Sequence, residues 1–223
     1  MDVAASDLLK GSWYSLEQCG LLLKSAVALY REKDYSTAVG VAMFAREELG
    51  KHRILRARWK SAVQTGQLPS VEQVRKICED HIEKQKQAQG SVTLNAASGS
   101  HIGTAIKTMI EKARTPGDPE FQEADKHIKA AVEAKEKHDP KERHEKRLEG
   151  FFVDLEESGT TWARPSKTIS QDEALKLLGD AANNYAAQQD RFSNPALLQD
   201  PQLAEALEAW SDKPALPPPI WSG

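Results

Sequence analysis

The chain has 223 residues, of which 39% are hydrophobic and 28% charged, with a mean hydropathy of −0.58. This composition excludes a disordered chain and allows a sizeable core. The formal net charge of −3 does not require a nucleic-acid partner. Two cysteines are too few for a disulfide scaffold or a zinc ribbon, so we expect reduced thiols and no metal or other cofactor.

No apolar run is long enough to span a bilayer; the longest covers only residues 38–45. The first ten residues lack the apolar stretch of a secretory signal. We therefore expect a cytoplasmic protein that does not enter a membrane.

The first half of the chain predicts helices from its apolar spacing. Apolar residues recur every three or four positions from Leu16 to Tyr30, which indicates one helix. Asp34 is placed to cap a second helix over 35–63, and so short a connection predicts an antiparallel pair. Ser70 and Gln73 form a capping-box pattern that predicts a third helix over 71–89.

The remaining elements follow from similar signals. A Gly/Ser/Ala-rich connector covers 90–103, and helices are expected over 104–114 and 119–138. Residues 151–169 are β-prone, with a Ser-Gly turn and an Arg-Pro step, and predict an extended arm or small hairpin. Further helices are expected over 170–192 and 201–210. The pattern predicts an all-α bundle, with one domain over 1–210 and a proline-rich extended tail over 211–223.

Several enzyme classes lack their motifs here. The sequence contains no GxGxxG, GxSxG or HExxH, and no Gly-Lys-Ser/Thr triplet. A di-iron bundle needs Glu-x-x-His pairs, but none of the six histidines follows an acidic residue at that spacing. We therefore expect no metal site.

Charged side chains gather at the end of the second helix. Glu47, Glu48 and Lys51 follow an alanine-rich stripe. This pattern predicts either surface ion pairs four residues apart, such as Glu47 with Lys51 and Glu48 with His52, or a polar cluster that faces the core. Further along, Arg53, Arg56 and Lys60 share one helix face with no acid among them. That face suits nucleic-acid phosphates, or is an ordinary exposed helix end.

The stretch 26–55, AVALYREKDYSTAVGVAMFAREELGKHRIL, resembles the AbiV family of bacterial abortive-infection proteins, part of the HEPN-like superfamily. The resemblance lies in the aromatic after the turn, the small-residue helix and the Glu-Glu-x-Gly-Lys end. VRKICEDHIEKQ is similar to the family's His-x-x-Lys segment and places His81 and Lys84. RLEGFFVDL is similar to a further segment and places Arg147 and Asp154.

The resemblance implies a HEPN-like helical bundle that forms a homodimer and acts in defence against phage. Many HEPN proteins are metal-independent ribonucleases with an Arg-x4–6-His motif, in which the histidine transfers protons and the arginine stabilises phosphorane charge. Two strings fit that spacing, from Arg46 to His52 and from Arg75 to His81. By this resemblance the catalytic candidates are Arg75, His81, Lys84 and Glu48.

Two functions remain open at this stage. The first is an abortive-infection protein that cleaves or binds RNA. The second is a non-catalytic sensor or antitoxin-like partner that docks a phage or host protein. A buried carboxylate is costly without a cation, so we expect Glu47 or Glu48 within ion-pair distance of His81, Lys84 or Arg147. Lys51 and Asp154 complete the expected polar cluster.

Overall fold

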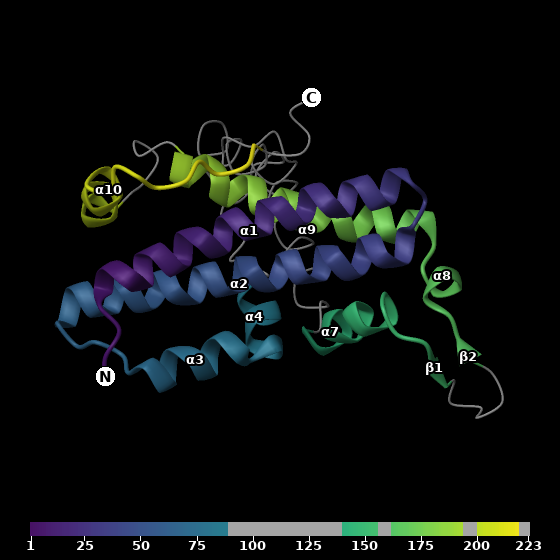
Figure 1. Cartoon of the computed structure of the whole chain (residues 1–223), viewed down its shortest axis with the longest axis horizontal. Coiled ribbons are helices and arrows are strands. Elements are labelled where there is room, and N and C mark those ends of the chain that lie inside the picture. Colours follow the sequence, from purple (N-terminus) through teal and green to yellow (C-terminus); the bar gives the residue numbers. More distant parts are fainter. Residues whose placement is uncertain (89–139, 156–161, 194–199, 219–223) are drawn as a thin grey trace, which may run out of the picture. The chain divides into compact units, whose positions relative to one another are not determined.

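Two long helices form the frame of the protein in a computed structural model that describes residues 1–88, 140–155, 162–193 and 200–218. Helices α1 (Ala5–Arg31) and α2 (Tyr35–Thr65) run antiparallel, as predicted (Figure 1). Asp34 caps α2 by accepting a hydrogen bond from the Thr37 N–H. At the other end of the pair, Val3 N donates to Pro69 O.

The predicted third helix is two helices. Helix α3 (Val71–Glu79) begins at the expected capping box of Ser70 and Gln73, and α4 (His81–Ala88) follows after a break at Asp80. The prediction of one helix over 71–89 is wrong because the extended Asp80 caps α4, its carboxylate accepting from the Glu83 N–H. The Asp-x-x-Glu spacing at Asp80 and Glu83 was the signal for this break.

The second half of the described chain returns to the α1–α2 pair. Helix α7 (Pro140–Glu149) and helix α9 (Gln171–Ser193) both contact α2. The expected connector over 90–103 and the expected helices over 104–114 and 119–138 lie outside the described residues. Helix α10 (Pro201–Glu208) begins, as predicted, where Asp200 accepts from the Leu203 N–H.

The expected arm over 151–169 contains a small hairpin and one helical turn. Strands β1 (Asp154–Leu155) and β2 (Trp162–Ala163) pair antiparallel. The prediction that the arm lacks helix is wrong for α8 (Pro165–Thr168). Proline at the first helical position has a suitable φ and lacks an N–H that would be unpaired there. The Ser36 hydroxyl donates to Pro165 O and so holds the arm against α2.

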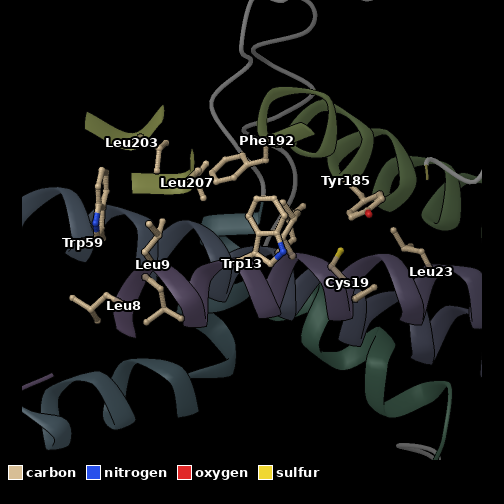
Figure 2. Close-up of a cluster of buried hydrophobic side chains, with 14 of the residues drawn as sticks. Leu8, Leu9, Trp13, Cys19, Leu23, Trp59, Tyr185, Phe192, Leu203 and Leu207 are labelled. Atoms are coloured by element: carbon tan, nitrogen blue, oxygen red, sulfur yellow. The ribbon is translucent and has the colours of Figure 1, made fainter. Parts of the chain in front are cut away.

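The main core lies where α1, α2, α9 and α10 meet, and Figure 2 shows its larger side chains. Its labelled members are Leu8, Leu9, Trp13, Cys19, Leu23, Trp59, Tyr185, Phe192, Leu203 and Leu207. The segment after α10 lies across this core. Two side chains of the core hold it there: Trp13 Nε1 donates to Pro214 O at 2.8 Å, and Tyr185 Oη donates to Pro217 O at 2.5 Å. A second cluster fills the turn end of the α1–α2 pair.

The all-α fold class is confirmed. The described helices alone account for more than half of the 223 residues. Within the described part of the chain, no helix has both the length and the apolar content of a membrane span.

Candidate functional site

Helix α4 lies unusually close to α2 because Gly50 has no side chain. A Cβ at Gly50 would lie 2.7 Å from the Lys84 carbonyl carbon and 2.9 Å from its Cα, closer than atoms pack. Gln85 secures the contact, since its fully buried side-chain amide donates to Met43 O at 3.1 Å. The glycine of the Glu-Glu-x-Gly-Lys segment therefore lets the α4 backbone lie against α2.

Helix α7 reaches α2 by a second glycine contact. A Cβ at Gly150 would lie 2.7 Å from Ser36 O and 3.0 Å from the Gly40 Cα. This close approach at the end of α7 brings Arg147, one turn earlier, over the middle of α2. Helices α4 and α7 also contact each other. Three segments far apart in the sequence thus meet beside Glu47.

Glu47 is the centre of a polar cluster, which we call the Glu47 cluster: Glu47, His81, Lys84, His144 and Arg147. Glu47 Oε2 lies 2.6 Å from His81 Nδ1 and 3.3 Å from Lys84 Nζ. Glu47 Oε1 lies 3.1 Å from Arg147 Nη1, a charge pair without hydrogen-bond alignment, because this oxygen has no hydrogen-bond partner. Glu47, Lys84 and Arg147 are buried. Three basic groups from two helices therefore surround one buried carboxylate.

His81 differs from its partners because 46% of its side chain is exposed. A carboxylate accepts hydrogen bonds, so this contact places a proton on Nδ1, and in the neutral ring Nε2 is then the nitrogen without a proton. Arg147 Nη1 lies 3.2 Å from His81 Nδ1. A carboxylate that orients an accessible imidazole in this way prepares it as a general base.

His144 stacks on His81, with ring centroids 5.7 Å apart and an interplanar angle of 29°. Burial lowers the pKa of His144, and the Arg147 cation acts in the same direction. With both histidines neutral, the two cations Lys84 and Arg147 outweigh the Glu47 carboxylate by one positive charge. The cluster therefore favours an anion, and more so when a histidine is protonated.

The sequence left open which carboxylate joins these bases, and the geometry selects Glu47. Glu48, a catalytic candidate, instead pairs with Lys51 at 2.6 Å. The alternative surface pairs, Glu47 with Lys51 and Glu48 with His52, do not form. Adjacent residues of a helix point about 100° apart, so only one of the two carboxylates faces α4 and α7.

Arg75 lies exposed on α3. Among the described residues, the arginine that contacts His81 is Arg147, from α7. A catalytic role for Arg75 stays a prediction. Asp154, expected in the polar cluster, lies in β1, where its backbone pairs with Ala163.

The other Arg-x4–6-His string is buried and its two side chains have different surroundings. His52 is fully buried and its Nδ1 lies 3.0 Å from Ser12 O on α1. Burial lowers its pKa to about 3. Arg46 is also buried, and burial lowers the pKa of its guanidinium to about 9, with Arg143 acting in the same direction.

The basic face expected to bind nucleic acid makes contacts within the chain. Arg53 Nη1 donates to Gln87 O and Ala88 O at 2.8 and 2.9 Å, which caps the end of α4. The guanidinium of Arg56 lies over the Phe192 ring, and Lys60 Nζ is 3.6 Å from Asp200. Their role toward nucleic acid stays a prediction.

Sequence reasoning missed His144. Its spacing of three residues before Arg147 on a helix was the available signal, because such residues share a face. Among the described residues, no group of three or more His, Cys, Asp or Glu side chains is arranged to hold a metal ion.

A family model described as AbiV, of the HEPN group, matches residues 8–186. That range includes most of α1, all of α2, α3, α4 and α7, and every member of the Glu47 cluster. No curated protein and no solved structure is significantly similar to the chain.

Proposed function

The chain belongs to the AbiV family of HEPN proteins, which are abortive-infection proteins, and we propose that it acts by cleaving RNA at His81 without a metal ion. The observation that carries this proposal is the Glu47–His81 pair. A half-exposed imidazole is held at 2.6 Å by a buried carboxylate, beside two cations.

The chemistry follows from the groups in the cluster. His81 Nε2 accepts the proton of an RNA 2′-hydroxyl, whose oxygen attacks the adjacent phosphorus. A bond forms from O2′ to phosphorus and the bond from phosphorus to O5′ breaks, which leaves a 2′,3′-cyclic phosphate. The departing 5′-oxygen takes a proton from water. The excess positive charge of Lys84 and Arg147 favours the negative charge that develops on the phosphorane.

Purified protein incubated with total RNA, with and without EDTA, tests the proposal. We expect cleavage that EDTA does not prevent and that His81→Ala reduces by at least about 100-fold, the usual contribution of a general base. His81 is half exposed, and Lys84 and Arg147 remain paired with Glu47, so this variant should stay folded. Arg75→Ala is the matched comparison, and its full activity would assign the arginine role to Arg147. Unchanged cleavage by His81→Ala would refute the proposal.

A second function is favoured by a different observation. Glu47, Lys84 and Arg147 are buried and pair within one chain, which suits a structural latch in a non-catalytic protein that docks a phage or host protein. Phage protection and melting temperature separate the two functions. Loss of protection by His81→Ala at an unchanged melting temperature, together with RNA cleavage by the wild type, supports the nuclease. Full protection by His81→Ala and no cleavage supports the docking protein.

A further inference from the structure

A shallow cavity of about 490 Å³, wide open to solvent, shares Arg147 with the Glu47 cluster. Phe44 of α2 and the end of α7 with its following turn line it, through Arg147, Leu148, Phe151 and Phe152. Its volume is within the range of small-molecule sites. Arg147 belongs to both features, since its Nη1 pairs with Glu47 and the residue also lines the cavity.

The cavity combines a held aromatic pair with a free ring. Phe44 and Phe151 have ring centroids 5.5 Å apart at an interplanar angle of 35°, and the Arg147 Cζ lies 5.2 Å from the Phe44 centroid. Phe151 is pressed against α2, where any side chain at Gly40 would overlap its ring. Phe152, by contrast, is 62% exposed.

We propose that this cavity binds one nucleobase of single-stranded RNA, next to the phosphate that lies at the Glu47 cluster. The inference rests on the proposed RNA function and adds to it the site that holds the substrate. The base stacks on Phe152 and on the rim of the Phe44–Phe151 pair, and Arg147 links base site and phosphate site.

Charge and shape favour a nucleobase over other occupants. Proteins that hold single-stranded RNA combine aromatic faces with adjacent cations, because each nucleotide has a flat ring and a phosphate. Here the aromatic wall and the cluster with its excess positive charge share Arg147, whose Cζ lies over the Phe44 ring at 5.2 Å from its centroid. A purely apolar partner would gain nothing from the charge beside the cavity. The arrangement contains no base-specific hydrogen-bond set, so we expect stacking without strong sequence preference.

Binding of short 2′-O-methyl RNA by the full-length wild type tests the inference. Such RNA has no free 2′-hydroxyl and is not cleaved by the proposed reaction. Fluorescence anisotropy compares oligouridylate, oligoadenylate and an abasic oligomer of equal length and charge. We expect the abasic probe to bind about tenfold more weakly or worse, the usual scale of stacking on one aromatic ring. We expect the same loss for oligoadenylate on Phe152→Ala, and recovery on Phe152→Trp.

Val153→Ala is the matched control, since Val153 is similarly exposed at 59% but does not line the cavity. Equal binding of abasic and base-bearing probes, or equal losses for Phe152→Ala and Val153→Ala, would overturn the inference and leave RNA cleavage at His81 standing. Base-dependent binding at the cavity without any RNA cleavage would support the inference and refute the proposed cleavage at His81. No binding of any probe would reject both. Dissociation of a dimer by Phe152→Ala, at unchanged RNA affinity, would assign the cavity to a second copy of the chain and also overturn the inference.

Discussion

Gly50→Ala should destabilise the protein although it places alanine, the best helix former, inside a helix. The new Cβ would lie 2.7 Å from the Lys84 carbonyl carbon and 2.9 Å from its Cα. The Lys84 carbonyl oxygen would lie closer still. Because ordinary contact begins near 3.4 Å, α2 and α4 must separate by about 1 Å or more. The obstacle is backbone, so no side-chain rotation relieves it.

The expected cost combines three effects. Overpacking costs about 1–3 kcal/mol. Movement of α4 also lengthens the contacts of Glu47 with His81 and Lys84. Breaking a buried ion pair completely costs about 3–5 kcal/mol. Only part of this cost applies here, because Arg147 on α7 remains paired with Glu47. Helix propensity returns about 1 kcal/mol. We expect a net loss of about 2–4 kcal/mol in the free energy of unfolding.

Urea denaturation followed by far-ultraviolet circular dichroism measures this loss. Gly179→Ala in α9 is the matched control, because a Cβ there meets no atom within 4 Å. The control should gain about 0.5–1 kcal/mol from reduced backbone entropy. A Gly50→Ala variant that equals the wild type or shifts in the same direction as Gly179→Ala would refute the packing argument.

Three further predictions concern the cluster, pH and assembly. Glu47→Gln should lower the free energy of unfolding by about 3 kcal/mol in urea titrations, because it leaves Lys84 and Arg147 buried without a countercharge. Glu48→Gln should lower it by at most about 1 kcal/mol. The opposite ranking of the two variants would contradict the assignment of Glu47. Burial lowers the pKa of His52 from 6.5 to about 3. Between these two pH values the unfolded chain binds a proton that the folded chain excludes. The free energy of unfolding should therefore fall as the pH drops below 6.5, by up to about 1.4 kcal/mol per pH unit. His52→Asn should flatten that dependence in urea titrations at several pH values, and an unchanged slope would rule His52 out. Light scattering should return about twice the chain mass of 24.7 kDa for the expected homodimer, and the mass of a single chain at micromolar concentration would rule the dimer out.

Part of the candidate site was predictable from the sequence. His81, Lys84 and Arg147 were expected near Glu47 or Glu48 for two reasons. The three residues lie in segments that resemble those of the family, and a buried carboxylate is stable only beside a cation. The position of Phe152 at the cavity was not predictable, since an exposed aromatic after a helix gives no local signal for a cavity.

The sequence alone determined where α2, α3 and α10 begin. Asp34, Ser70 and Asp200 cap helices through hydrogen bonds to backbone N–H groups three residues away, and apolar spacing marks the faces that pack. These interactions are local, so a short stretch of chain contains all that decides them.

Only the tertiary structure decided which charged side chains meet. Glu47 and Glu48 are adjacent and chemically alike, and the faces of α2 that α4 and α7 cover distinguish them. Arg147 lies 100 positions after Glu47 in the chain and pairs with it from α7. The close approach of α7 to α2 depends on the backbone contact at Gly150. Long-range contacts of this kind depend on how whole helices pack, which periodicity and capping do not specify.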